Sequence, residues 1–363
     1  DLCFVVAVAQ AASSYHHELV EGHIADGLIG FGMGFFAVWW GWMNFTWFAS
    51  AHDTDDVTHR VLTLIQMAGA LVLAAGISRA VERSEFEVVV IGYLIMRIGL
   101  LASWLRVAAH DDDGRRRALR YAGGIAAVQV LWVGRLVLPD GVQLGSFVIL
   151  ALAEMAIPLW AEQALDRPLF HPHHIEARYG LFTIIVLGES ILSATVGFQG
   201  AVEAGGLTSE LAAIGVGGLV LAFGLWWLYF DHPGHLSPTP GQSFRWGYAH
   251  VVVFASLAAL GAGVFVAAEA AGHHASARTG ALAVALPVAA FLLGLVLIMV
   301  LTGTNVGDVR AWPKATAAVV VVVVGLVAPV VAAVVFCAVV VIAMVVWMIA
   351  AGDDPDAVEL VGS

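Results

Sequence analysis

Three charged residues stand out because each lies within a long apolar stretch of the sequence: Arg97, Glu154 and Glu189. Counted from the ends of the helices that we expect around them, each lies about ten residues deep, or roughly 15 Å. An ionisable residue at that depth in a membrane costs about 2.5–3.5 kcal/mol on insertion scales, and it usually faces a bundle interior or a wet cavity. We therefore expect a polar site between helices, in which Arg97 faces one or both glutamates.

Two interpretations of this charged group stay open. The two carboxylates could bind or couple an ion or a proton, with Arg97 as the counter-charge. Alternatively, the charges form a structural ion pair between helices, because a buried charge needs a partner for purely physical reasons. Gln10 and Gln129 are polar at a comparable depth, and Gln10 completes the set of predicted substrate- or ion-binding residues: Glu189, Glu154, Arg97 and Gln10. No catalytic residue is predicted.

A second polar group is expected at the cytoplasmic side of the stretch "HHIEARYGLFTIIVLGES". Arg178 and Glu189 are close to three helical turns apart, so they share a face, and His174 lies near it. Asp231 ends the next apolar stretch on the same side, which makes a pair with Arg178 or His174 plausible. The sequence thus predicts a cytoplasmic gate, with a purely structural clamp as the alternative, formed by His174, Arg178, Asp231 and Asn44.

Four further motifs are rich in histidine, tryptophan or glycine. "HHELVEGH" (His16–His23) and "HPHHIE" (His171–Glu176) offer metal-binding donors, but neither has a known zinc spacing, so we favour polar loops and expect no metal and no cofactor. The run "WWGWMNFTW" (Trp39–Trp47) favours an aromatic belt at the membrane interface, with a ligand-stacking surface as the alternative. "GFGMGFF" (Gly30–Phe36) has small residues that permit close helix approach.

The elements that carry these residues are long apolar blocks. The 363-residue chain is 60% hydrophobic and 12% charged, whereas a soluble domain has about 25% charged residues. We predict an all-α, polytopic transmembrane bundle, with Pro329 dividing the last apolar block.

The first apolar run is too short to span a bilayer, so we expect the chain to begin inside its first helix. The predicted helices are 1–14, 27–49, 58–79, 86–108, 118–138, 142–164, 174–198, 211–231, 246–270, 280–302, 313–331 and 333–351.

Charge and internal similarity suggest how these helices are organised. Most of the 16 basic residues would lie on the side of the chain's start, which predicts cytoplasmic termini in a bacterial inner membrane. Leu2–Gln10 aligns weakly with Leu181–Glu189, and Ala37–Phe45 with Gly224–His232. These alignments predict two parallel six-helix repeats. The expected divisions are a first transmembrane half at 1–166, a second at 167–352, and an acidic cytoplasmic tail at 353–363.

Several stretches, in order along the chain, resemble the bacterial low temperature requirement protein A family. They are "DLCFVVAVAQ", "FFAVWWGWMNFTWFASAHDTDD", "RVLTLIQMAGALVLAAGI", "HHIEARYGLFTIIVLGESIL" and "LWWLYFD". The resemblance runs from Asp1 to about His250. It implies a multi-pass membrane protein, but the family name describes a growth phenotype and implies no substrate or reaction.

These observations favour a secondary transporter or channel-like protein for a small ion or polar solute. One alternative is a membrane sensor or scaffold. The other is an intramembrane enzyme acting on a lipid-type substrate at the cytoplasmic interface, although an enzyme is less favoured. The expected partners are the lipid bilayer and the small ion or solute, and not nucleic acid; a homo-oligomer is left open. No phosphate-binding loop motif supports ATP-driven transport by this chain.

Overall fold

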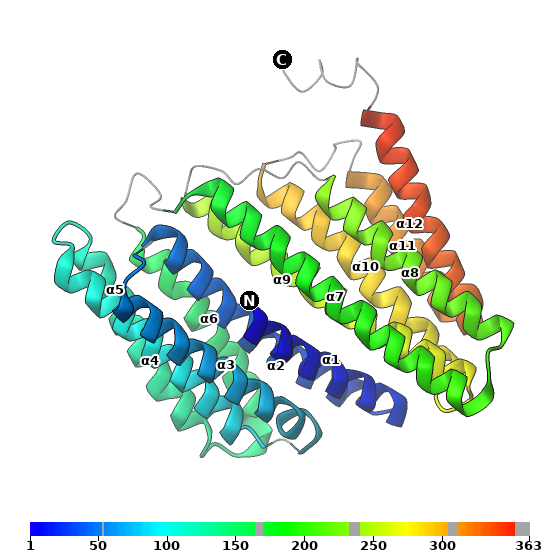
Figure 1. Ribbon diagram of the computed structural model, residues 1–363, viewed down its shortest axis with the longest axis horizontal. Coiled ribbons are helices and arrows are strands. Elements are labelled where there is room, and N and C mark those ends of the chain that lie inside the picture. Colours follow the sequence, from blue (N-terminus) through cyan, green and yellow to red (C-terminus); the bar gives the residue numbers. More distant parts are fainter. Residues whose placement is uncertain (53, 84, 164–169, 232–239, 304–310, 353–363) are drawn as a thin grey trace. The chain divides into compact units, whose positions relative to one another are not determined.

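The computed structural model has an all-α fold. It describes residues 1–52, 54–83, 85–163, 170–231, 240–303 and 311–352. These described residues form twelve α-helices and one 3₁₀ helix at Asp140–Val142, without a strand. The twelve helices predicted from the sequence are therefore confirmed (Figure 1). Their bounds are α1 (Leu2–Glu21), α2 (Ile24–Ala51), α3 (Val57–Arg83), α4 (Glu87–His110), α5 (Arg115–Arg135), α6 (Gln143–Ala161), α7 (Pro172–Gly205), α8 (Ser209–Phe230), α9 (Pro240–Ala271), α10 (Ala277–Leu301), α11 (Ala311–Val327) and α12 (Val330–Gly352).

Proline and glycine set several of the helix ends. α11 and α12 are separate helices with Pro329 between them, as predicted. α1 continues to Glu21, past the expected end at residue 14, and stops where Gly22 has a φ of +90°. α7 likewise extends to Gly205 and stops before Gly206, whose φ is +80°. Glycine without a Cβ adopts this left-handed conformation easily, so both helices run on until such a glycine ends them.

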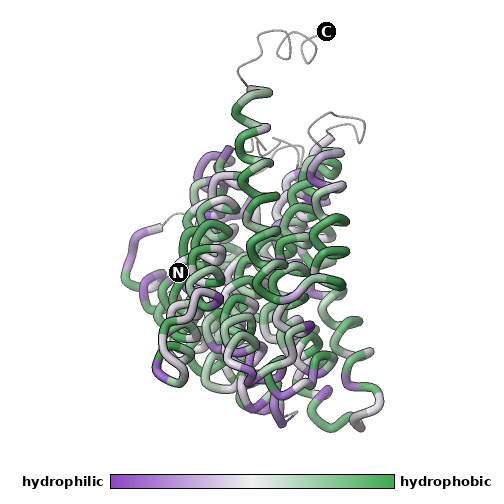
Figure 2. The backbone as a smooth tube through the Cα atoms, turned by 90° about the vertical axis from the view of Figure 1, so that its right-hand side faces the viewer, coloured by the Kyte–Doolittle hydropathy of each residue, from purple (hydrophilic) through white to green (hydrophobic). Residues whose placement is uncertain are grey.

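Nine of the described helices are long and apolar enough to span a membrane: α2, α3, α4, α6, α7, α8, α9, α10 and α12. α11 is apolar but has only 17 residues. α5 begins with the basic run "RRRALR", and the second half of α1 carries the polar sequence "SSYHHELVE". Figure 2, which colours the backbone by residue hydropathy, shows that most of the helical residues are hydrophobic. The fold is thus a polytopic transmembrane helical bundle.

Contacts divide the chain into two compact units. The first comprises Asp1–Ser14, Ala25–Tyr179 and Leu236–Arg245, and the second Tyr15–Ile24, Gly180–His235 and Trp246–Ser363. In the first unit α3 packs on α4, α4 on α5, and α5 on α6 (Figure 1). In the second unit α10 contacts α11 and α12, and α12 contacts α8. The predicted six-helix repeats are untested by this division, and the predicted tail at 353–363 lies outside the described residues.

The tryptophans of α2 form part of the core of the first unit. Trp39, Trp40 and Trp42 are 0%, 1% and 0% exposed. Trp39 and Trp40 pack on Phe36, and Trp42 packs edge-on against Tyr179. The interpretation of these three side chains as an aromatic belt is therefore wrong, because a belt residue faces the membrane interface rather than protein.

The start of α8 is fixed by a side-chain cap. The Leu211 N–H donates to Thr208 Oγ1 at 3.1 Å. We expect Thr208→Ala to lower the free energy of unfolding by about 1 kcal/mol, because the cap is lost. Thr208→Ser keeps the acceptor and should cost clearly less. Unfolding of the purified chain in mixed micelles, titrated with a denaturing detergent, measures both; equal losses for Ala and Ser would contradict the capping role.

Candidate functional site

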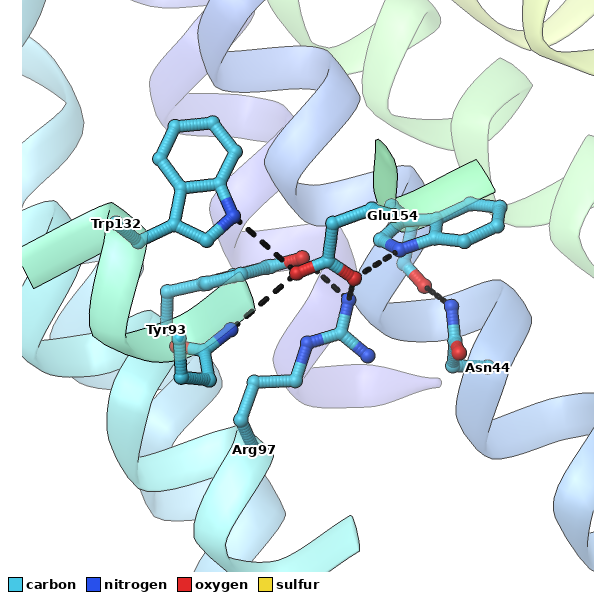
Figure 3. Close-up of polar contacts among 7 residues, drawn as sticks. Asn44, Tyr93, Arg97, Trp132 and Glu154 are labelled. Atoms are coloured by element: carbon cyan, nitrogen blue, oxygen red, sulfur yellow. Dashed lines mark hydrogen bonds and ion pairs between the residues drawn. The ribbon is translucent and has the colours of Figure 1, made fainter. Parts of the chain in front are cut away.

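Four donors from three helices surround the carboxylate of Glu154 in the first unit. Arg97 Nη2 and Trp40 Nε1 donate to Glu154 Oε2 at 2.9 and 2.8 Å. Trp132 Nε1 and Gln129 Nε2 donate to Oε1 at 3.2 and 3.3 Å. Arg97 and Glu154 are only 2% and 1% exposed. Figure 3 shows Arg97 and Trp132 pointing toward this carboxylate from different helices. A carboxylate has about four lone-pair sites, so the donors leave Glu154 little capacity for a further ligand.

Helical spacing brings the donors to one place. Gln129 and Trp132 are three residues apart on α5 and share a face. On α4, Tyr93 and Arg97 are four residues apart; Arg97 Nη2 also donates to the Tyr93 hydroxyl, and the guanidinium lies 4.6 Å from the centre of the tyrosine ring. Glu154 from α6 thus meets donors that come from α2, α4 and α5.

Arg97 and Gln129, unlike Glu154, keep polar atoms that are free to form further hydrogen bonds. Arg97 Nε and Nη1 and Gln129 Oε1 are buried without a hydrogen-bond partner. They border a groove between α4 and α5 whose other lining residues are apolar. Free guanidinium N–H groups suit water or an anion, and not a cation. The pairing of Arg97 with Glu154 is therefore observed, whereas an ion-binding role for either residue stays a prediction.

Glu189 belongs to the second unit and has different surroundings. It lies at the middle of the 34-residue helix α7 and is half-buried. Its carboxylate forms no hydrogen bond or ion pair with the described residues of that unit. The next residue, Ser190, is buried and donates to the carbonyl oxygens of Val186 and Leu257, at 2.9 and 2.6 Å. The α7 backbone is thus fixed against α9 directly beside a carboxylate that has no partner in the part of its unit that the structure describes.

Arg178, predicted to form the gate, is held by a residue that the sequence reasoning missed. Its Nη1 and Nη2 each lie 3.1 Å from an oxygen of the Asp1 carboxylate. Trp42 Nε1 also donates to Asp1 Oδ1, at 3.0 Å. Asp1 and Arg178 are 177 positions apart, so no local pattern could connect them. The only signal was an acidic residue at the head of the first helix.

The other predicted residues lie at separate places. His174 is exposed in the first turn of α7, and Asp231 is exposed directly after α8, in the second unit. Asn44 is half-buried in α2 and donates from Nδ2 to the Trp40 carbonyl at 2.8 Å. Gln10 is exposed and accepts from the Ser78 hydroxyl at 3.5 Å. A gating role for the first three, and ligand binding by Gln10, stay predictions.

One histidine motif forms a small cluster at the end of α1. The ligand atoms of Glu18, Glu21 and His23 all lie within 4.8 Å of one another. His23 Nδ1 lies 3.2 Å from Glu18 and 3.6 Å from Glu21, and His17 Nε2 lies 3.3 Å from Glu21. Such a set could hold a divalent cation, but mutual ion pairs at a helix end also explain it. The expectation of no metal stays untested.

Comparison with known proteins gives a match along almost the whole chain. The family model described as bacterial low temperature requirement A protein (LtrA) matches residues 1–351. A relative named uncharacterized protein RA0937, from Rhizobium meliloti (strain 1021), is 23% identical over 248 residues. The match covers 64% of this chain and 57% of that relative. No solved structure matches the chain significantly.

Proposed function

The chain belongs to the bacterial low temperature requirement A family, and we propose that it is a secondary transporter or channel-like protein. Its cargo in this proposal is a small ion or polar solute. Glu189 is the carboxylate that couples movement of the cargo to a proton or a cation. The observation that carries the proposal is the position of Glu189: half-buried, at the middle of a membrane-spanning helix, and without a partner among the described residues of its own unit.

The electrostatic cost of a buried charge explains why the position of Glu189 matters. A charged carboxylate near the middle of a bilayer is costly, and the cost is removed when it binds a proton or a cation. A structural carboxylate avoids the cost with fixed partners, as Glu154 does with four donors. Glu189 has no such partners among the described residues of its unit. It therefore gains most from an exchangeable ligand, which is what coupling requires.

In this proposal Arg97 and Glu154 hold the first unit together and do not bind cargo. Their pair lies inside a complete set of hydrogen bonds to the carboxylate, and displacing any donor would leave a buried group unsatisfied. The two carboxylates that the sequence suggested as equivalent thus have different roles. Glu154 organises helices, and Glu189 exchanges its ligand.

Orientation and partners are further parts of the proposal. The distribution of basic residues supports cytoplasmic termini and an inner-membrane location. The bilayer and the cargo are the expected partners, and no cofactor is invoked. A sensor or scaffold would keep Glu189 without moving any solute. An interfacial enzyme would instead need His174, Glu176, Arg178 and Asp231.

Flux measurements in proteoliposomes test the proposal. With an imposed proton, sodium or potassium gradient, the wild type should move at least one of a panel of inorganic ions, amino acids and small polar solutes. Glu189→Gln should reduce this flux to the level of empty liposomes. Glu203→Gln is the matched control, because Glu203 is exposed near the end of the same helix and accepts a hydrogen bond from Gln199 Nε2 at 2.9 Å. No flux in the wild type, or equal flux in Glu189→Gln, would overturn the proposal.

A further inference from the structure

A cavity of about 40 Å³ lies at the end of the first unit where α2, α4 and α6 finish and α5 begins. This volume exceeds the roughly 10–15 Å³ that a cavity needs to hold a water molecule. Its walls are mostly aromatic: Trp47, Phe48, Trp104, Tyr121, Phe170 and Phe244. These rings pack on one another. Trp104 stacks on Tyr121 at 4.0 Å between ring centres, and Trp47 stacks on Phe244 at 5.1 Å.

Arg117 brings a positive charge to this cavity. It lies in the first turn of α5, lines the cavity and is only 7% exposed. Its Nε and Nη2 atoms are buried without a hydrogen-bond partner. No ion pair within 4.0 Å joins it to a carboxylate of the described residues. A buried, unsatisfied charged donor costs considerable free energy, so these two atoms need an acceptor that the described side chains do not supply.

The identity of the two free atoms indicates the shape of that acceptor. Nε and Nη2 lie on the same edge of the planar guanidinium, and their N–H bonds point in nearly the same direction. This edge matches two oxygens of one carboxylate or phosphate group and binds them with two parallel hydrogen bonds. The N-terminus of α5, with its positive dipole end, favours the same charge.

Two neighbouring groups add to this chemistry. His52 lines the cavity, and its Nε2 is also buried without a partner. Burial lowers the pKa of His52 to about 4, with a further contribution from Arg117 that Asp111 opposes, so the neutral ring can donate one hydrogen bond. Glu162 accepts from the Tyr121 hydroxyl at 3.0 Å. Burial raises the pKa of Glu162, although Arg117 and Tyr121 oppose the increase. Its carboxylate is the group in the cavity that would repel an anion.

We propose that this cavity is a binding site for an oxyanion group, either a carboxylate or a phosphate, held by the Nε/Nη2 edge of Arg117 with His52 as a second donor. The aromatic walls lower the local dielectric and so strengthen these charged hydrogen bonds. The site takes a free small anion or the phosphate of a lipid headgroup, which have the same chemistry here. The inference does not depend on transport or on Glu189.

Calorimetric titration of the full chain, purified in an uncharged detergent, tests the site with sodium phosphate and sodium acetate as probes. The wild type should bind at least one of them. Arg117→Met removes both hydrogen bonds and should weaken binding by at least about 10- to 100-fold, which is the equivalent of one charged hydrogen bond. Arg117→Lys keeps the charge but loses the two-atom edge, so it should also bind more weakly than the wild type. The melting temperature of each variant, measured without anion, shows whether it is folded.

Two further variants make the result specific. Arg116→Met is the matched control, because it removes an exposed positive charge from the adjacent position of α5; its affinity should equal that of the wild type. Glu162→Gln, measured at pH 8, should bind more tightly, a gain that misfolding cannot produce. Equal losses in Arg116→Met and Arg117→Met would mean non-specific charge attraction and would overturn the proposal, as would weaker binding by Glu162→Gln.

Native mass spectrometry distinguishes the two sources of the oxyanion. If a phospholipid occupies the site, the wild type should retain one that Arg117→Met loses and Arg116→Met keeps, and added phosphate should not bind until lipid is removed. If the ligand is a free anion, retained lipid should be the same in all three proteins while the titrations differ. Absence of both an Arg117-dependent lipid and Arg117-dependent anion binding would overturn the proposal.

Discussion

Glu154→Ala is expected to lower the free energy of unfolding by about 3–5 kcal/mol, because it leaves the buried charge of Arg97 without its partner. The same change removes the acceptor of Trp40 Nε1, Trp132 Nε1 and Gln129 Nε2. Arg97→Met should destabilise the chain similarly, since it leaves the carboxylate buried with only neutral donors. Reversible unfolding of the purified chain in mixed micelles measures both losses.

The double variant Arg97→Met/Glu154→Leu shows whether the pair acts as a unit. Replacing a buried ion pair by apolar side chains of similar size is often nearly neutral, so the double variant should lose much less than the sum of the losses of Arg97→Met and Glu154→Leu measured singly. It should also keep gradient-driven flux if the pair only holds helices together. Additive losses would contradict the coupling. A stable double variant without flux would mean that Arg97 and Glu154 take part in transport.

The charged pair could be predicted from the sequence, whereas its surroundings could not. An arginine and a glutamate in separate apolar helices need partners on energetic grounds alone, which is why Arg97 and Glu154 were suggested together. Trp40 and Trp132 gave no such signal, because a tryptophan in a membrane helix has other common roles. Asp1 was missed for a related reason: its pairing with Arg178 depends on tertiary contacts that no local spacing encodes.

The number of helices followed from the apolar blocks, but several ends did not. Pro329 separates α11 from α12 because proline cannot continue the preceding helix, and this break could be predicted. The extension of α1 and α7 beyond their predicted ends could not be predicted from the apolar blocks. Polar residues follow the apolar part of α1, so hydropathy placed its end too early. Helical hydrogen bonding continues through such residues until a glycine in a left-handed conformation ends it.

Close contact between helices depends on glycines whose importance the sequence did not reveal. The motif at 30–36 suggested close packing of α2, but the tightest approach in the first unit joins α3 and α4. A Cβ added to Gly69 would lie 2.5 Å from the backbone nitrogen of Met96. One added to Gly92 would overlap the Leu73 nitrogen and lie 2.6 Å from the Leu73 Cα. Backbone atoms cannot rotate away as a side chain can, so these glycines let the two helices touch.

Gly92→Ala should therefore lower the free energy of unfolding by about 1–3 kcal/mol, the usual cost of overpacking, although alanine by itself favours a helix over glycine by about 1 kcal/mol. Gly123→Ala is the matched control, since Gly123 lies within α5 and a Cβ there meets no atom within 4 Å. It should be neutral or stabilising. Unfolding in mixed micelles compares the two, and a crosslink between cysteines placed on α3 and α4 should form more slowly in Gly92→Ala. If Gly92→Ala is as stable as Gly123→Ala, α3 and α4 do not touch at this point, because a direct backbone contact has no room for the added methyl group.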